Sequence, residues 1–192
     1  MMNNEAAIAS AKGLISNPVL ACDVLSHDLL VEIGNIARTK GHLELKKDEG
    51  AGKQAESYNC RLEHAPFLLP IVFSAYHHIL GTYGFDVSLD LTQQFLLNEY
   101  TGPSGEYPWH WDMSSQLMSD LKVTYIINAS VDKYEGGHFH LAHGNLNSTH
   151  VPHLDKPGSG ILFRANTLHK VDPVISGKRR SLVFFFEGPS WR

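Results

Sequence analysis

The second half of the chain consists of short apolar runs, and this feature constrains the fold more than any other. After Gly84, Gly, Pro, Asn and Asp separate such runs at residues 93–100, 108–112, 122–129, 138–142, 160–164, 168–174 and 180–187. Short apolar or alternating runs between turn-forming residues are typical of β-strands. Many of them at this spacing indicate a sandwich or a barrel. We therefore expect a mainly β protein.

Two amphipathic segments precede the predicted strands. Ser26 is a suitable N-cap for a helix over residues 27–40, in which apolar side chains recur at helical spacing and Gly41 follows the end. A second helix is predicted from about Pro66 to Leu80, ending at Gly81. We expect both helices to pack outside the β core. A length of 192 residues, of which 43% are hydrophobic, suits a single core. Residues 1–20 are predicted to form a flexible tail, and residues 21–192 one domain with its barrel at about 84–188.

Composition and charge narrow the range of partners. The formal net charge is −4, and no run of Lys and Arg provides the basic surface that nucleic acids or anionic membranes attract. No apolar run is long enough to span a bilayer. The two cysteines cannot form a disulfide framework, which favours the cytoplasm. These features predict a small-molecule or peptide substrate and leave the oligomeric state open.

A histidine and an aspartate at alternate positions are the strongest chemical signal. His110 and Asp112 flank Trp111 in a predicted strand, so their side chains leave the same face. His169, in a later predicted strand, can supply a third ligand. Two histidines and one carboxylate on one side of a metal form the facial triad of non-haem iron(II) oxygenases. An isolated His-x-Asp pair is more often a surface pair, so the surrounding sequence has to decide.

The surrounding sequence resembles the prolyl-hydroxylase branch of the Fe(II)/2-oxoglutarate-dependent oxygenases. The matching parts are a tyrosine, a Gly-rich turn and a second tyrosine that lead into His-x-Asp at 100–112, and a Glu-Gly-Gly turn at 135–137. A third part comprises Gly160 to Phe163 and the stretch from His169 through Pro173 and Gly177 to Ser181. Each part alone is weak, but together, in this order, they are specific. The resemblance covers roughly residues 83–188.

This resemblance implies a double-stranded β-helix, a cupin-like jelly roll of two sheets with the metal between them. It implies that His110, Asp112 and His169 act as metal ligands and catalytic residues. Fe(II) is the expected metal, 2-oxoglutarate and O2 are the cosubstrates, and ascorbate is an expected reductant. The expected reaction hydroxylates a C–H bond of a small molecule, an amino acid or a peptidyl residue and releases succinate and CO2. Asp112 argues against halogenation, because halogenases of this type lack that carboxylate.

A basic residue after His169 tests this interpretation, because the carboxylate of 2-oxoglutarate that lies away from the metal must be neutralised. The planar guanidinium of arginine binds a carboxylate through two parallel hydrogen bonds. The resemblance aligns Arg179 with this role. Lys178 and Arg180 are its neighbours, and a register shift of one residue would exchange the assignment.

Further pocket residues follow from the same comparison. Tyr100 and Tyr125 are candidates to hydrogen-bond 2-oxoglutarate, although Tyr125 falls one position from the usual aromatic residue and an ordinary strand tyrosine explains it equally well. Asn98, which shares the parity of Tyr100, and His138 are candidate substrate contacts. The loops at 46–57, 114–120 and 143–153 are expected to form a lid over the substrate.

Three alternatives stay open. The same barrel and triad could serve a cupin-like metal hydrolase or isomerase, or a metal-binding module without catalysis. In addition, His138, His140 and His143 could bind a separate zinc, since a His-x-His pair can chelate from one strand face. The sequence places no carboxylate or thiolate beside these histidines, and an exposed polar strand edge accounts for them as well.

Overall fold

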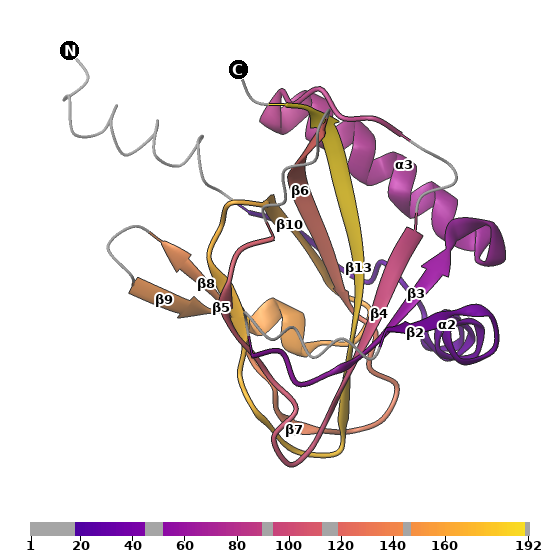
Figure 1. Ribbon diagram of the computed structural model, residues 1–192, viewed down its shortest axis with the longest axis vertical. Coiled ribbons are helices and arrows are strands. Elements are labelled where there is room, and N and C mark those ends of the chain that lie inside the picture. Colours follow the sequence, from indigo (N-terminus) through magenta and orange to yellow (C-terminus); the bar gives the residue numbers. More distant parts are fainter. Residues whose placement is uncertain (1–17, 45–51, 90–93, 113–118, 144–146, 191–192) are drawn as a thin grey trace.

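A large antiparallel sheet forms the framework of the protein (Figure 1). The computed structural model describes residues 18–44, 52–89, 94–112, 119–143 and 147–190. The seven-stranded sheet has the order β1-β10-β6-β13-β4-β3-β2. Its strands are β1 (Val19–Ala21), β2 (His42–Glu44), β3 (Glu56–Arg61), β4 (Gln94–Thr101), β6 (Ser119–Asn128), β10 (Gly160–Arg164) and β13 (Lys178–Pro189).

Two smaller sheets complete the β structure. A four-stranded sheet has the order β5-β11-β8-β9, formed by β5 (Tyr107–His110), β11 (His169–Val171), β8 (Phe139–His143) and β9 (Asn147–His150). A two-stranded sheet pairs β12 (Val174–Ser176) with β7 (Glu135–Gly136). The large and the four-stranded sheets bury a cluster between them that includes Ile126, Phe139, Phe163 and Val183. This arrangement is the predicted mainly β jelly roll.

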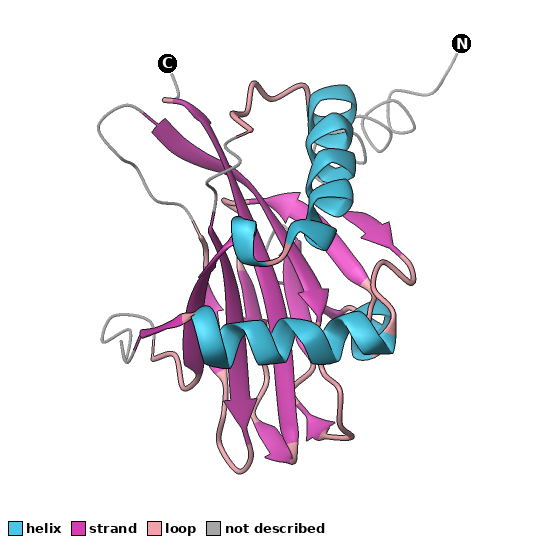
Figure 2. Ribbon diagram, turned by 90° about the vertical axis from the view of Figure 1, so that its right-hand side faces the viewer, coloured by secondary structure: helices cyan, strands magenta, loops and turns pink. Residues whose placement is uncertain are grey.

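Helices cover the opposite face of the large sheet (Figure 2). They are α2 (His27–Lys40) and a segment in which short 3-10 turns, η1 (Leu62–His64) and η2 (Pro66–Leu68), lead into α3 (Leu69–His78) and the π-helical turn η3 (Ile79–Tyr83). Another 3-10 helix, η4 (Pro152–Asp155), follows β9. Buried apolar side chains of α2 and α3, such as Ile33 and Val72, form a second cluster with Phe95 and Phe184 of the sheet. The sheet therefore has one face toward the helices and one toward the smaller sheets.

The structure corrects several predicted boundaries. The first helix covers the predicted residues, but the second continues beyond Gly81 and ends at Gly84, whose φ of 64° suits the left-handed conformation that stops a helix. Val19 and Leu20, predicted as tail, belong to β1, which pairs with β10. The predicted loop 46–57 includes the first residues of β3, and the predicted loop 143–153 contains β9 and part of η4. These two stretches were missed because their residues are polar. The strand β3 gains order by pairing with the distant β4, and β9 by pairing with its neighbour β8.

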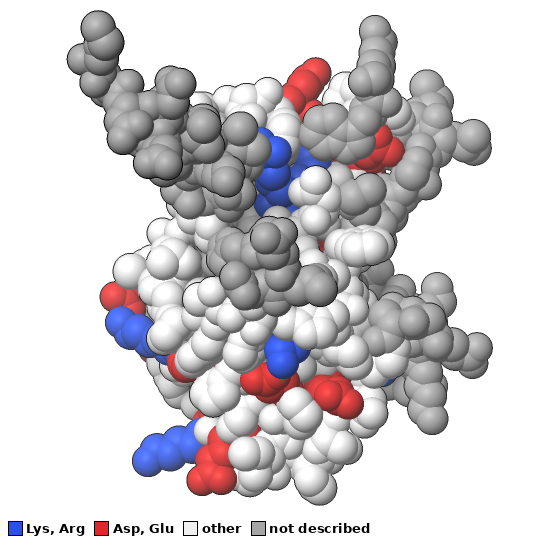
Figure 3. Space-filling model, turned by 90° about the vertical axis from the view of Figure 1, so that its left-hand side faces the viewer, with Lys and Arg blue, Asp and Glu red and all other residues white. Residues whose placement is uncertain are grey.

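The surface carries charges of both signs. On the face shown in Figure 3, the described Lys and Arg side chains lie among Asp and Glu side chains, and neither sign gathers into a continuous patch. Within the described part of the chain, no helix is long and apolar enough to cross a membrane.

Candidate metal centre

The three predicted metal ligands converge in the structure. Strands β5 and β11 pair so that His110 and His169 are direct partners, and Asp112 follows the end of β5. His110 Nε2 lies 3.6 Å from Asp112 Oδ1, and His169 Nε2 lies 3.5 Å from Asp112 Oδ2. All three ligand atoms fall within 4.8 Å of one another. One metal ion can therefore contact all three.

Hydrogen bonds hold each ligand in a metal-binding orientation. The Nδ1 atom of His110 lies 2.8 Å from the carbonyl oxygen of Pro108, and that of His169 lies 2.9 Å from the carbonyl oxygen of Thr167. When Nδ1–H donates to these carbonyls, Nε2 keeps its lone pair for the metal. The hydroxyl of Thr124, on β6, donates to Asp112 Oδ2 at 2.8 Å. The site thus has the outer hydrogen bonds that metal centres require.

Burial sets the charge state of these ligands. Loss of solvation lowers the pKa of both His110 and His169 to about 4, so both imidazoles are neutral near pH 7. Burial also raises the pKa of Asp112 above its ordinary value, while His110 and the Thr124 hydroxyl oppose this shift. Neutral imidazoles beside a buried carboxylate favour a cation that contacts all three groups.

Arg179 lies buried on the same side of the large sheet as the three predicted metal ligands. Its side chain is 1% exposed, and it stands opposite Tyr100 across the β13–β4 ladder, with the guanidinium 5.6 Å from the centre of the tyrosine ring. Its Nη1 donates to Ser181 Oγ, whereas Nε and Nη2 are buried without a hydrogen-bond partner among the described residues. Unpaired buried donors are costly, and an arginine that keeps two of them is suited to a ligand that accepts both.

The Glu-Gly-Gly turn at residues 135–137 leaves room for the side chain of Arg179. Gly137 has a φ of 63°, and a Cβ atom at that position would lie 2.7 Å from Arg179 Cδ. A side chain here would therefore displace the arginine. The glycine permits a close approach of the turn to the guanidinium, which accounts for this part of the motif in physical terms.

A cavity of about 120 Å³ connects the triad with polar side chains of the large sheet. Asn98 and Tyr100 of β4 line it, together with Ser181 of β13 and Lys53. Lys53 Nζ donates to Asn98 Oδ1 at 2.8 Å and to Ser57 Oγ at 2.7 Å. The structure thus places Asn98 and Tyr100 at the cavity, as the sequence predicted, and adds Lys53 and Ser57.

Two predicted site residues lie elsewhere. Tyr125 packs in the cluster under the helices, 6.2 Å from Phe184 between ring centres, because its neighbour Thr124 points to Asp112 and adjacent residues of a strand face opposite ways. Its assignment to 2-oxoglutarate binding is therefore corrected. His138 does not line the triad cavity either and instead contacts Asp155.

The neighbours of Arg179 also point away from the cavity. Lys178 and Arg180 both donate to the buried carboxylate of Glu99, at 3.0 and 2.5 Å. These two hydrogen bonds lower the pKa of Glu99, although burial alone would raise it. Of the three basic residues, Arg179 is the one on the face of the large sheet that lines the cavity.

Sequence reasoning missed three residues of the site. Thr124 was passed over because its role depends on a distant aspartate, and Lys53 and Ser57 because they lie in or beside a stretch predicted to be a loop. A signal was present only for Ser57, since it begins a short β-like run from Ser57 to Cys60. No local pattern marked Lys53 as part of the cavity.

The donor set fits iron(II) and 2-oxoglutarate. Two imidazoles and one carboxylate leave coordination positions open for a cosubstrate. The unpaired donors of Arg179 match a carboxylate acceptor at the other end of that cosubstrate.

Comparisons with known proteins agree with this assignment. The model of the 2OG-Fe(II) oxygenase superfamily matches residues 95–187. Over 98 residues, the chain is 32% identical to a PKHD-type hydroxylase of Sphingopyxis alaskensis, and this match covers 48% of the chain but only 43% of that relative. It is 25% identical over 176 residues to a PKHD-type hydroxylase of Azoarcus sp. (strain BH72), covering 86% of this chain and 75% of the relative.

Among solved structures, a Pseudomonas putida prolyl-4-hydroxylase has a TM-score of 0.67, and the match covers 96% of this chain and 99% of that one. The sequence identity is 14%, so the likeness is one of fold. The jelly roll, the converging triad and the match to the family model lead to one conclusion: residues 95–187 belong to the 2OG-Fe(II) oxygenase superfamily, and the fold around them resembles that of a prolyl-4-hydroxylase.

Proposed function

We propose that the protein is an Fe(II)- and 2-oxoglutarate-dependent hydroxylase, with His110, Asp112 and His169 as the iron ligands and Arg179 as the anchor for 2-oxoglutarate. The observation that carries the proposal is the buried guanidinium of Arg179, whose Nε and Nη2 have no partner among the described residues, on the sheet face that also lines the triad cavity. Iron(II) with 2-oxoglutarate supplies the activation of O2 for C–H oxidation, with release of succinate and CO2.

The residues of the chain provide binding, orientation and a dry site. The triad offers two neutral imidazoles and one carboxylate, and Arg179 offers a paired set of donors to the distal carboxylate of 2-oxoglutarate. Tyr100 lies beside Arg179, and burial raises the pKa of its hydroxyl to about 12. It therefore remains a hydrogen-bond donor near pH 7. Apolar side chains such as Phe139 and Val183 line the rest of the cavity.

The substrate belongs on the side of the cavity lined by Lys53 and Asn98. Lys53 Nζ is held by Asn98 and Ser57 through short hydrogen bonds, so the cavity offers a cationic group at a fixed place. We propose a small molecule, amino acid or peptidyl residue with a polar group that contacts this pair. Both curated relatives are PKHD-type hydroxylases, which supports hydroxylation as the reaction. Most of the predicted lid at 114–120, and part of those at 46–57 and 143–153, lies outside the described residues.

A cupin-like hydrolase or isomerase would use the same triad without 2-oxoglutarate. Such an enzyme has no use for a buried arginine with two unpaired donors, and leaving them unpaired costs about 1–3 kcal/mol for each group. A metal-binding module without catalysis would carry the same free-energy cost, with no bound 2-oxoglutarate to offset it. The oxygenase proposal accounts for Arg179, and these alternatives do not.

The proposal extends to the reductant and the compartment. We propose that ascorbate supports turnover by returning oxidised iron to the iron(II) state. Cys22 is exposed and Cys60 is buried, and both are free thiols, which fits a reducing compartment such as the cytoplasm.

The decisive experiment supplies the purified protein with iron(II), 2-oxoglutarate, ascorbate and O2 and measures succinate. We expect succinate formation even without a substrate at a low rate, and stimulation when a substrate is present. Asp112→Ala should lower succinate formation by at least about 100-fold, because loss of even an outer hydrogen-bond partner of a metal ligand costs 10–100-fold.

Asp28→Ala is the matched control, since Asp28 is fully exposed on α2 and far from the triad in the fold. It should leave succinate formation unchanged. Circular dichroism and iron content establish that each variant folds and how much metal it holds. Equal turnover by the parent protein and a folded Asp112→Ala variant would refute the assignment of the iron ligands.

A further inference from the structure

A second group of two histidines and one aspartate lies outside the iron centre. His138 precedes β8, His150 ends β9, and Asp155 ends η4. Their ligand atoms all lie within 4.8 Å of one another, as do those of the iron triad. None of these three residues lines the triad cavity. The second group is therefore a separate site.

The distances in this group suit a metal ion. His138 Nδ1 lies 3.1 Å from Asp155 Oδ1, and His150 Nε2 lies 2.9 Å from Asp155 Oδ2. Tetrahedral ligands about 2.0–2.1 Å from Zn²⁺ stand roughly 3.3 Å apart. A shift of a few tenths of an ångström would bring both pairs to this separation, and such shifts are open to side chains that are one-third to one-half exposed.

Hydrogen bonding leaves one of these atoms without a partner. His138 Nδ1 is within hydrogen-bond geometry of Asp155, but the buried Nε2 atom of His150 has no hydrogen-bond partner among the described residues. It approaches the carboxylate closely, yet its ring is not oriented to donate to it. A cation between His150 Nε2 and the carboxylate would use the nitrogen lone pair and restore the missing interaction.

His140 belongs to a different interaction. Its Nε2 atom lies 2.7 Å from Asp172 Oδ2, and Asp172 also pairs with Lys170 at 2.6 Å. The strand therefore does not present His138 and His140 as a chelating pair. The zinc ligand set considered from the sequence, His138 with His140 and His143, is corrected, because the tertiary structure brings His150 and Asp155 to His138 instead.

We propose that His138, His150 and Asp155 form a second metal site that binds Zn²⁺. Two imidazoles and one carboxylate are a common zinc ligand set, whereas Ca²⁺ and Mg²⁺ prefer oxygen ligands alone. The proposal does not rest on the oxygenase activity, since it uses none of the residues of the iron centre.

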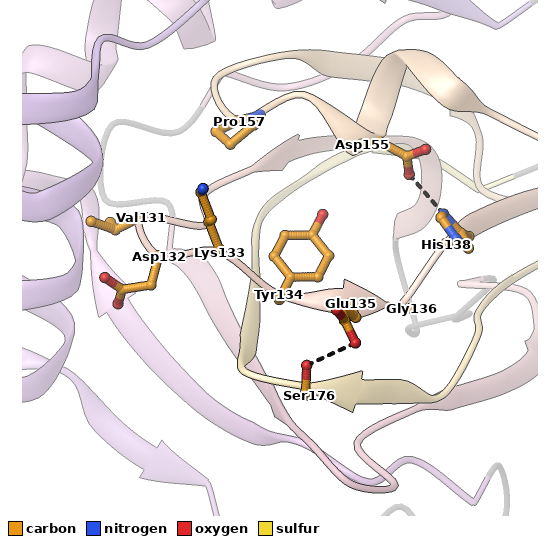
Figure 4. A pocket seen from close by; sticks show the side chains of 10 residues that line it. All are labelled: Val131, Asp132, Lys133, Tyr134, Glu135, Gly136, His138, Asp155, Pro157 and Ser176. Atoms are coloured by element: carbon orange, nitrogen blue, oxygen red, sulfur yellow. Dashed lines mark hydrogen bonds and ion pairs between the residues drawn. The ribbon is translucent and has the colours of Figure 1, made fainter.

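His138 and Asp155 of the proposed site border a large cavity (Figure 4). His138 and Asp155 line a cavity of about 680 Å³ together with Tyr134, Glu135 and Pro157. In Figure 4 the His138 and Asp155 side chains point toward each other at one edge of this cavity. Water or an anionic group of a ligand can complete the coordination from there. The bound ion joins the β8–β9 hairpin to η4, which fixes this wall of the cavity.

Zinc binding to the full-length chain, measured by calorimetry and by metal content after dialysis, tests the proposal. The Asp112→Ala, His169→Ala double variant removes the first centre, so that the second is measured alone. We expect one Zn²⁺ per chain in this background. Adding Asp155→Ala should weaken binding by at least about 10-fold. His64→Ala, at an exposed histidine of η1, is the control and should leave the affinity unchanged.

A second measurement does not depend on the double variant. In the otherwise unmodified chain, Zn²⁺ should raise the midpoint of thermal unfolding further than in an Asp155→Asn variant, because a ligand of the native state stabilises it. The proposal is overturned if the double variant retains no Zn²⁺, or if Asp155→Ala and His150→Ala bind it as tightly as the background. Failure of succinate formation would leave this result unaffected, so the two proposals can fail separately.

Discussion

The two faces of the seven-stranded sheet are made by alternate residues of the same strands, yet they have different roles. On the inner face, Asn98 and Tyr100 line the cavity beside the metal ligands, and Arg179 stands opposite Tyr100. On the outer face, Phe95, Leu97 and Phe184 pack under the helices. Because a strand alternates its side chains, each functional residue has a structural neighbour one position away.

The basic residues of β13 show this difference most clearly. Arg179 is buried on the inner face with two donors that have no partner in the described part of the chain, whereas Arg180 and Lys178 bind Glu99 on the outer face. Burial is similar for Arg179 and Glu99, but among the described residues both carboxylate oxygens of Glu99 have partners, whereas two nitrogens of Arg179 have none. The buried donors without a partner among the described residues therefore set Arg179 apart from its two basic neighbours on β13.

The largest expected difference between the faces is between Arg179 and Arg180. Arg179→Ala should cost about 2–5 kcal/mol of 2-oxoglutarate binding, on the order of 30-fold or more in KM, because it removes one partner of a buried charge pair. Arg180→Ala should leave this KM within about 2-fold. Succinate formation at varied 2-oxoglutarate measures both. The reverse result would mean that β13 is shifted by one residue.

A smaller effect is expected at Glu99, on stability rather than on binding. The folded-state pKa of Glu99 is lowered, so its ion pairs stabilise the protein above about pH 4.5 and lose this effect as the pH falls through the folded-state value. Glu99→Gln should reduce the free energy of unfolding by roughly 1–3 kcal/mol at pH 7 and by less at pH 3.

Urea denaturation at both pH values measures this difference. Glu63→Gln is the matched control, because Glu63 pairs with Arg61 at 3.0 Å while both are about half exposed. Exposed pairs contribute about 0–1 kcal/mol, so this control should show little change. A loss for Glu99→Gln that is the same at pH 3 and pH 7 would contradict a role for its charge.

The smallest expected effect is a difference between Tyr100 and Tyr125 in the KM for 2-oxoglutarate. Tyr100→Phe should raise the KM for 2-oxoglutarate by about 2- to 10-fold, the equivalent of one hydrogen bond of 0.5–1.5 kcal/mol. Tyr125→Phe should leave it unchanged, since Tyr125 packs beneath the helices. Steady-state kinetics on both variants tests the comparison. A larger effect from Tyr125 would show that the ring reaches the site.

The sequence could predict those parts of the site that depend on local spacing. His110 and Asp112 were predicted together because alternate residues of a strand leave the same face, although β5 itself ends at His110. Arg179 was favoured over its neighbours by the family resemblance, whereas strand parity alone left a shift of one residue open. The first helix was predicted with its bounds because its periodicity and its flanking residues, Ser26 and Gly41, are local as well. Short strands such as β1 and β9 were missed, because three or four residues carry too little pattern to distinguish them from loops.

By itself, therefore, the sequence predicted the superfamily, the β-rich fold, the three proposed iron ligands and the proposed anchor for 2-oxoglutarate, since each depends on alternation along a strand or on motifs of fixed order. Only the tertiary structure decided which face of β6 carries Tyr125, that Lys53 enters the iron cavity, and that Asp155 joins His138 and His150. The physical reason is that these contacts depend on how strands and loops distant in the chain are registered against one another. That register is set by the burial of whole faces, and no single stretch of sequence contains it.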